Sequence, residues 1–492
     1  MDMKASPLAV LADATLLKTD ALIGGEWRAG GARFDVLDPA TGRKLVDVAD
    51  LGPADAQAAI DAASAAWPAW RARTAKERAG ILTEWHRLLL AHADDLARIM
   101  TAEQGKPLAE ARGEVTYGAS FIEWFAEEGK RVYGETIPTN DPNKRFLVIK
   151  QAAGVCAAIT PWNFPIAMIT RKVGPALAAG CTMVVKPAGQ TPLSALAVAE
   201  LGLRAGLPPG VLNVVTAKKS ADIGKLLCES PAVRHLSFTG STEVGRLLAA
   251  QCAPTVKKLS LELGGNAPFI VFDDADLDSA VEGALVSKYR NAGQTCVCAN
   301  RFYVQHGVHD AFVDKLADKA RAIKVGNGFD AGVTQGPMID ERALAKVEQH
   351  VADAIAKGAT VVTGGRRIGQ RFYEPTVLTG ATADMLCARE ETFGPVAPVF
   401  RFETEDEAVR LANATEFGLA AYFYSRDIGR IFRVGEALES GIVGVNTGLV
   451  STAEAPFGGV KQSGLGREGS RYGIEDYVEI KSLCLGDIQR KA

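Results

Sequence analysis

The sequence predicts an α/β protein that contains two mainly parallel sheets and a smaller third element made of strands. Short apolar strands alternate with helix-length segments from Gly154 to Asn291, and a second alternating series follows. Strands that alternate with helices are typical of parallel sheets with crossover helices. Two more strands lie outside both series, so they indicate a separate element.

The first series begins with an apolar strand at residues 155–160 and ends with a helix at 277–290. Between them, helices are expected at 166–179 and at the Ala- and Leu-rich run 193–204. The other expected strands are 182–186, 211–215, 235–238, 258–263 and 268–272.

The second series starts after a break near Gly264 and Gly265. Its expected elements are strands at 302–305, 360–362 and 442–445 and helices at 341–357 and 406–414. The two strands outside both series are 146–151 and 477–484. Unattached strands expose an edge, and association with another subunit is one way to cover that edge.

Length and composition indicate a globular protein with more than one core. The chain has 492 residues, and at roughly 150 residues per domain we expect two or three domains. Hydrophobic residues make up 47% and charged residues 23%, a balance typical of soluble globular proteins. The net charge of −3 gives no reason to expect nucleic acid or a membrane surface as a partner.

The sequence carries no clear export, membrane or metal signal. Residues 1–25 lack the long apolar core of a secretory signal. The longest uncharged run, 151–170, contains two prolines that would break a spanning helix. The eight cysteines do not suggest a disulfide scaffold, so a reducing cytoplasm is expected. The six histidines are scattered, so no metal site is expected.

Two short motifs carry candidate reactive groups. In Asn291-Ala-Gly-Gln-Thr-Cys-Val-Cys298, small residues let the backbone approach a ligand, and a Cys296 thiolate could attack a carbonyl carbon. A free cysteine is more often buried packing. In Leu259-Ser-Leu-Glu-Leu-Gly-Gly265, Glu262 interrupts an apolar strand. Burial there would raise its pKa and suit it to general-base work, whereas exposure would make it an ordinary edge residue.

Segments that follow strands offer polar groups for a ligand. In Thr160-Pro-Trp-Asn-Phe-Pro165 the prolines hold Asn163, whose NH₂ group could stabilise an oxyanion, unless the turn is purely structural. Lys186 ends one strand, and Ser241 begins a helix, where free amides favour phosphate. Gly464-Leu-Gly-Arg-Glu-Gly469 has a GxGxxG pattern but follows no apolar strand, so we do not interpret it as a dinucleotide fingerprint.

Taken together, six motifs resemble the aldehyde dehydrogenase superfamily over essentially the whole chain, from Gly24-Gly-Glu-Trp27 to the C-terminal strand. They are Pro161-Trp-Asn-Phe-Pro165, Phe238-Thr-Gly-Ser241, Leu261-Glu-Leu-Gly-Gly265, Gly293-Gln-Thr-Cys296, Glu391-Thr-Phe-Gly-Pro395 and Pro456-Phe-Gly-Gly459. The resemblance implies an aldehyde dehydrogenase-like α/β fold that forms homodimers or homotetramers. It implies a cofactor domain (1–132 and 153–264), a catalytic domain (265–464) and a small oligomerisation element (133–152 and 465–492).

The same resemblance implies roles for the matching residues. Cys296 is the nucleophile, Asn163 and the Cys296 backbone N–H stabilise the oxyanion, and Glu262 activates water. The thiolate adds to the aldehyde, hydride passes to the nicotinamide, and water cleaves the thioester; acylating relatives, which use coenzyme A, do without the glutamate. The residues implied in cofactor binding are Thr160, Trp162, Lys186 (adenosine ribose), Gly189, Gly240, Ser241 (pyrophosphate), Leu263, Glu391 (nicotinamide ribose) and Phe393 (beside the ring).

An alternative from another class is an NAD(P)-binding structural or regulatory subunit without catalysis, but every chemical residue is present. Cofactor choice depends on Gly189, where family members commonly have a Glu that binds the adenosine ribose. Its absence removes a carboxylate that would repel a 2′-phosphate, so NADP is the expected cofactor and NAD a second acceptor, unless Gly189 only relaxes selectivity.

Within the family, the segments around Cys296 and Asn163 resemble bacterial succinate-semialdehyde dehydrogenases of the NADP type. Arg171 and Arg290, with Ser451, are expected to bind the distal carboxylate of a small aldehyde, unless the arginines pair with acids. Glutarate semialdehyde or a broader range of ω-carboxy aldehydes stays an alternative, since a methylene contributes only about 1–3 kcal/mol of discrimination.

Cys298 resembles a second thiol of some succinate-semialdehyde dehydrogenases, where the pair forms a reversible disulfide that would switch activity off. A small buried residue is the equal alternative, because disulfide geometry over so short a span is demanding.

Overall fold

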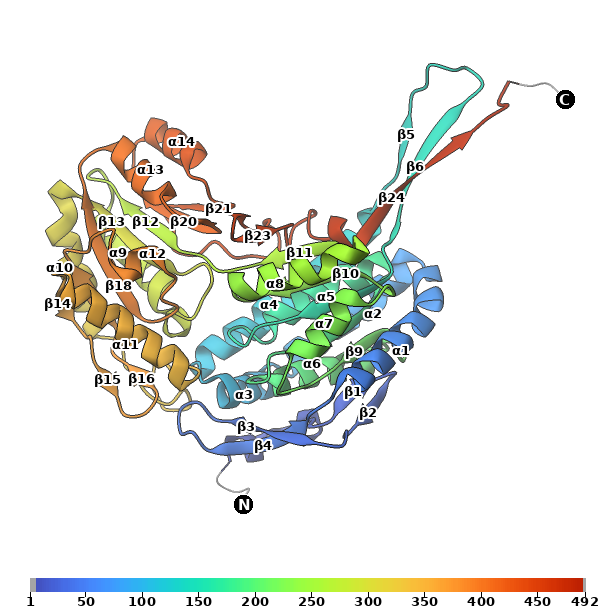
Figure 1. The fold of residues 1–492 in the computed structure, drawn as a ribbon, viewed down its shortest axis with the longest axis horizontal. Coiled ribbons are helices and arrows are strands. Elements are labelled where there is room, and N and C mark those ends of the chain that lie inside the picture. Colours follow the sequence, from blue (N-terminus) through green and yellow to red (C-terminus); the bar gives the residue numbers. More distant parts are fainter. Residues whose placement is uncertain (1–5, 490–492) are drawn as a thin grey trace.

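The computed structural model describes residues 6–489 and contains two large sheets that lie side by side, with a separate arm of strands (Figure 1). The first sheet has eight strands in the order β2-β1-β9-β8-β7-β10-β11-β23. Its five central strands run parallel, as the alternation of strands and helices predicted. The strands are β1 (Ala21–Ile23), β2 (Glu26–Arg28), β7 (Val155–Ile159), β8 (Thr182–Lys186), β9 (Leu212–Val214), β10 (Val233–Thr239), β11 (Lys258–Glu262) and β23 (Gly464–Leu465).

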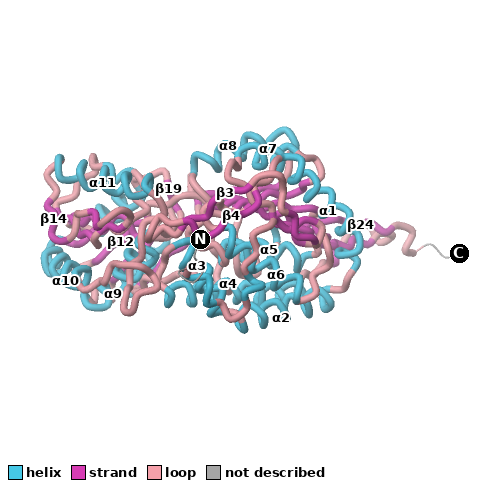
Figure 2. The backbone as a smooth tube through the Cα atoms, turned by 90° about the horizontal axis from the view of Figure 1, so that it is seen from below, coloured by secondary structure: helices cyan, strands magenta, loops and turns pink. Residues whose placement is uncertain are grey.

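Helices cover both faces of this sheet, and Figure 2 shows the two layers. Apolar residues of α1 (Pro53–Ala72), α7 (Ala221–Glu229) and α8 (Thr242–Cys252) share one core with the strands. The other face carries the larger core of the chain. Its helices are α2 (Ala75–Ala91), α3 (Ala93–Gln104), α4 (Leu108–Glu128), α5 (Ala167–Ala179) and α6 (Pro192–Arg204).

The second sheet has seven strands in the order β14-β17-β18-β13-β12-β20-β21, and only β14 is antiparallel to its neighbour. The strands are β12 (Ala267–Val271), β13 (Ala299–Gln305), β14 (Thr360–Thr363), β17 (Thr376–Thr379), β18 (Val396–Phe402), β20 (Ala420–Tyr424) and β21 (Ile442–Val445). The helices around it include α9 (Leu277–Tyr289), α10 (His309–Arg321), α11 (Glu341–Ala356), α13 (Glu405–Asn413) and α14 (Ile428–Ala437). The parallel α/β architecture is therefore as predicted.

The two strands that lay outside both series pair with each other. β24 (Val478–Leu485) runs antiparallel to β6 (Arg145–Ala152) along its whole length, and β5 (Glu135–Ile137) adds a third strand. This arm extends away from the rest of the molecule (Figure 1). It carries exposed apolar side chains, among them Ile480, which is 70% exposed.

The GxGxxG segment forms part of the first sheet, which its sequence did not predict. β23 lies within it and pairs antiparallel with the end of β11, where Gly464 faces Glu262. A Cβ atom on Gly464 would lie only 1.8 Å from the Leu261 carbonyl oxygen, so this close approach requires glycine. Turns and a short 3-10 helix (Glu475–Tyr477) follow.

Candidate active site

The loop that carries Cys296 is held in an unusual backbone conformation. It follows α9, and Asn291, Ala292 and Gly293 all have positive φ, at 52°, 55° and 74°. A Cβ atom on Gly293 would lie 2.2 Å from the Gly394 carbonyl oxygen, so only glycine allows this approach. Gln294 fixes the loop, because its side chain accepts from Ile339 N at 2.9 Å and donates to Pro337 O at 3.3 Å.

Asn163 lies beside this loop. Its Nδ2 donates to the Gln294 carbonyl oxygen at 3.1 Å, two residues before Cys296. The amide nitrogen has a second hydrogen, which remains for an oxyanion. Burial raises the pKa of the Cys296 thiol to about 12, although Arg171 opposes the shift. The thiol is therefore protonated at neutral pH until a base or an added positive charge favours the thiolate.

Glu262 ends β11 and is buried, with 3% of its surface exposed. Because it is buried, Glu262 is not an ordinary exposed residue at a strand edge. Neither carboxylate oxygen has a hydrogen-bond partner within residues 6–489. Burial, with the nearby charge of Glu468, raises the pKa of Glu262 well above its usual value. A carboxylate whose pKa is raised accepts a proton more readily and is suited to general-base work.

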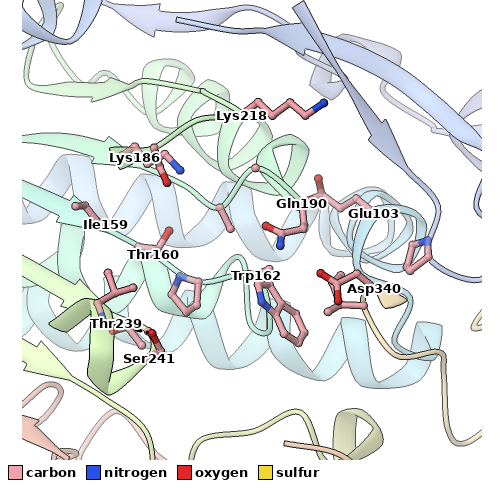
Figure 3. Close-up of a pocket in the computed structure, with 18 of the residues that line it drawn as sticks. Glu103, Ile159, Thr160, Trp162, Lys186, Gln190, Lys218, Thr239, Ser241 and Asp340 are labelled. Carbon is pink, nitrogen blue, oxygen red and sulfur yellow. Dashed lines mark hydrogen bonds between the residues drawn. The ribbon is translucent and has the colours of Figure 1, made fainter. Parts of the chain in front are cut away.

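A cavity of about 700 Å³ opens at the C-terminal ends of β7, β8 and β10 (Figure 3). Ser241 caps α8 there, its Oγ accepting from Val244 N at 3.4 Å. Burial lowers the pKa of Lys186 to about 8, and its ammonium has no ion-pair or hydrogen-bond partner in the described part of the chain. An unpaired buried cation fits a ligand with hydroxyl or phosphate groups. The expected cofactor residues on its wall are Thr160, Trp162, Lys186, Gly189, Gly240 and Ser241.

A second cavity, of about 240 Å³, shares Trp162, Gly240 and Ser241 with the first and reaches Cys296. Asn163, Leu263, Glu391 and Phe393 also line it. The Gly265 amide donates to Glu391 at 3.2 Å, and burial raises the pKa of this carboxyl to about 7. The Phe393 ring meets Trp162 edge-on, with 5.6 Å between centroids. Because the two cavities share lining residues, their walls together extend from Lys186 to Cys296.

A third cavity is lined by Cys296 together with Arg171, Arg290 and Ser451. Arg290 lies over the Phe164 ring at 5.4 Å and has no ion pair or hydrogen bond within residues 6–489. Arg171 is only 1% exposed and pairs with Glu468. The alternative of an arginine paired with an acid thus applies to Arg171, yet its buried Nη2 remains without a hydrogen-bond partner.

Cys298 does not face the cavities. It is 1% exposed, and its Sγ donates to the Lys288 carbonyl oxygen at 3.3 Å. Both Cys296 and Cys298 are free thiols. The surroundings of Cys298 are those of a small packed residue, and the reversible Cys296–Cys298 disulfide stays a prediction.

Several lining residues were not anticipated from the sequence. Lys218, on the loop after β9, is one of the residues that line the first cavity (Figure 3). The basic pair Lys218-Lys219 after a strand was the available signal. Glu103 also lines it, and accepts from Leu193 N and Ser194 N, both at 2.7 Å. Burial raises the pKa of Glu103 to about 8. No local pattern marks a glutamate that caps a helix some 90 residues further along the chain.

The described residues contain neither a candidate metal cluster nor a helix that could span a membrane. Residues 6–489 hold no cluster of three or more His, Cys, Asp or Glu side chains that could bind a metal ion. Every helix in the same range is too short or too polar to cross a lipid bilayer.

Comparison with known proteins shows strong similarity along the chain. The model of the aldehyde dehydrogenase family matches residues 27–483. The succinate-semialdehyde dehydrogenase [NADP(+)] of Escherichia coli is 64% identical, over 97% of this chain and 99% of the relative. A glutarate-semialdehyde dehydrogenase of Pseudomonas aeruginosa is 62% identical, over 97% and 100%. A crystal structure of succinate-semialdehyde dehydrogenase from Burkholderia pseudomallei is 66% identical, with a TM-score of 0.96 over 97% and 100%.

Proposed function

Because this chain belongs to the aldehyde dehydrogenase family, we propose that it oxidises succinate semialdehyde to succinate, with NADP as the preferred cofactor and NAD as a second acceptor. The main support for this choice of substrate is the unpaired Arg290 guanidinium, which shares a cavity with Arg171 and Cys296. Two guanidinium groups beside the nucleophile suit an aldehyde that has a carboxylate at its far end. The similarity to the Escherichia coli enzyme supports both the substrate and the cofactor.

In the proposed reaction, the Cys296 thiol first loses its proton to water, and the resulting thiolate forms a bond to the aldehyde carbon. The carbonyl oxygen becomes an oxyanion, which Asn163 Nδ2 and the Cys296 backbone N–H stabilise as donors. Glu391 and Phe393 line the cavity beside Cys296 and would hold a nicotinamide there. Such a group would supply the hydride acceptor that the carbon bound to Cys296 needs to become a thioester. Glu262 then takes a proton from water, and the resulting hydroxide attacks the thioester, breaks the carbon–sulfur bond and releases the carboxylic acid and the Cys296 thiolate. A base at this position favours hydrolysis over transfer of the acyl group to coenzyme A.

The cofactor preference follows from charge. Gly189 contributes no carboxylate to the adenosine side of the first cavity, whereas Lys186 and Lys218 both line that cavity. A 2′-phosphate would meet two cations and no opposing charge from residue 189. These residues would hold the nucleotide, while Glu391 and Phe393 would position the nicotinamide half.

The wider organisation belongs to the same proposal. Residues 1–132 and 153–264 would bind the cofactor, 265–464 would carry the catalytic loop, and 133–152 with 465–492 would join subunits. The exposed apolar side chains of the arm, such as Ile480, support association into a homodimer or homotetramer. A cytoplasmic location fits eight free cysteines.

An activity panel of succinate semialdehyde, glutarate semialdehyde, butanal and betaine aldehyde tests the substrate. We expect the two semialdehydes to give the highest kcat/KM, with succinate semialdehyde first. Glutarate semialdehyde is the competing substrate, because the Pseudomonas aeruginosa relative acts on it. Equal kcat/KM for butanal would refute the carboxylate site. The Cys296→Ser variant should lose several decades of activity, and near-normal turnover would refute the thioester itself.

A further inference from the structure

A buried lysine outside the motifs contacts the candidate oxyanion donor from behind. Lys106 lies between α3 and α4 and is 2% exposed. Its ammonium forms an ion pair with Glu114 and donates to the Asn163 carbonyl oxygen at 2.8 Å. It also lies 4.0 Å from the centre of the Phe164 ring. Apart from the ion pair with Glu114, these contacts all fall on the turn that carries Asn163.

Glu114 holds the other end of the same turn. Its Oε1 accepts from Ile166 N at 2.9 Å and from Ala167 N at 3.3 Å. These amides begin α5, which has no side-chain N-cap of its own. A carboxylate at a helix N-terminus satisfies free amides and complements the helix dipole. The Lys106–Glu114 pair thus brackets the turn from Asn163 to the first residue of the helix.

The loop that carries Cys296 also contacts the Asn163 carbonyl oxygen. Asn291 Nδ2 donates to the Asn163 carbonyl oxygen at 3.0 Å and to the Gln294 carbonyl oxygen at 3.1 Å. Gln104 Nε2 in turn donates to Asn291 Oδ1 at 2.9 Å. The Asn163 carbonyl therefore receives two donors, one from each side, and its side-chain amide has little freedom to move relative to Cys296.

Burying an ammonium group has a cost that an apolar side chain of similar length would avoid. Burial lowers the pKa of Lys106, and the charge of Glu114 opposes that shift. Oxyanion donors stabilise developing charge only when their position is fixed before the reaction. The Lys106 ammonium donates to the main chain of Asn163, whose side chain is the candidate oxyanion donor, and so meets that requirement.

We propose that Lys106 is a positioning residue for Asn163: its ammonium fixes the Asn163 main chain so that the side-chain amide points at the carbonyl oxygen of the substrate bound to Cys296. The inference rests on the proposed function, because the position of Asn163 matters only if an oxyanion forms there.

A double-mutant cycle tests this role in the full-length protein. Turnover of succinate semialdehyde is measured for the unmodified chain, Lys106→Met, Asn163→Ala and the double variant. We expect Lys106→Met to lower kcat by about 10- to 100-fold in the unmodified background. In the Asn163→Ala background the same Lys106→Met change should lower kcat by less than about threefold, because the effects of substituting residues that act as a unit are not additive. The KM for NADP should not change.

Lys257→Met is the matched control. Lys257 is partly buried, less so than Lys106, and its ammonium likewise donates to main-chain carbonyls, those of Leu227 at 3.0 Å and Ser230 at 2.9 Å. It lies away from the cavities, so its loss should leave kcat unchanged. If Lys106→Met does not fold, Glu114→Gln takes its place, since the glutamine can still accept from Ile166 N while Lys106 loses its carboxylate. It should show the same non-additivity with Asn163→Ala.

The outcomes separate the inference from the proposed function. An equal loss in both backgrounds, or no loss with Lys106→Met, would overturn the role of Lys106 and leave the thioester mechanism standing. Full turnover by Asn163→Ala would remove the oxyanion role of Asn163, and the inference with it. Activity that survives Cys296→Ser would refute the proposed function as a whole.

Discussion

Replacing Arg290 by methionine is the sharpest test of the carboxylate site. The guanidinium has no ion pair or hydrogen bond among the described residues, so its removal breaks no direct contact with a buried acid. Burial raises the pKa of the nearby Glu110 and Cys296, and the Arg290 charge opposes that rise. Comparing an aldehyde that has a distal carboxylate with one that has none therefore separates substrate contact from the effect of the charge on the thiol. Arg171 is less suitable, because its loss would leave Glu468 with only the Lys172 ammonium as an ion-pair partner.

The expected magnitude follows from one charge-assisted hydrogen bond. Such a bond contributes about 1.5–3 kcal/mol, and each 1.4 kcal/mol corresponds to about a tenfold change. Arg290 is partly exposed, so solvent screening places the effect near the lower limit. We expect kcat/KM for succinate semialdehyde to fall about 10- to 30-fold in Arg290→Met, mostly through KM.

The assay follows the absorbance of reduced cofactor with succinate semialdehyde and with butanal, which has no distal charge. The kcat/KM for butanal should fall by a smaller factor, because only the effect of the Arg290 charge on the Cys296 thiol acts on it. Arg290→Lys should recover part of the activity, since it keeps the charge but loses the planar fork. Equal losses for both aldehydes, or an unchanged KM for the semialdehyde, would refute the assignment of Arg290 to substrate binding.

Three further outcomes are expected. Glu262→Gln should slow thioester hydrolysis more than hydride transfer and leave a pre-steady-state burst of reduced cofactor. Because burial raises the pKa of Glu262, hydrolysis by the unmodified chain should increase as pH rises and the carboxylate forms; a missing burst would contradict this role. Gly189→Glu should shift the kcat/KM ratio from NADP toward NAD, and a clear NAD preference in the unmodified chain would contradict the charge argument. Peroxide should inactivate the enzyme reversibly with dithiothreitol, and inactivation that persists in Cys298→Ala would exclude the disulfide switch.

The strands of the first series could be predicted because each has a local signal. The runs at 155–160 and 182–186 are apolar and end at polar or proline residues, and the structure places β7 and β8 there. The short strand β23 has no such signal. It contains only Gly464 and Leu465 and exists because the end of β11 offers it a pairing edge. An element that depends on a distant partner leaves no periodic pattern in its own residues.

The same distinction applies to the candidate site. Cys296, Glu262 and Asn163 stood out as polar groups in apolar or glycine-rich surroundings, and the structure brings Cys296 and Asn163 to one cavity. Lys106 and Glu468 did not stand out. Both are charged residues in segments that look like solvated surface, and their burial appears only when helices and loops from distant parts of the chain close over them.

The late position of β23 also sets an order of assembly during synthesis. The seven-stranded sheet is complete once Val445 has been made, whereas the eight-stranded sheet, most of which is synthesised earlier, still lacks its last strand. At about 5–20 residues per second, the roughly 200 residues between Glu262 and Gly464 delay that strand by roughly 10–40 seconds. Glu468, the acidic partner of Arg171 and Lys172, arrives later still. A nascent chain that ends before Glu468 therefore lacks the acid that pairs with Arg171 and Lys172, so these two cations become buried as ion pairs only after that segment has been made.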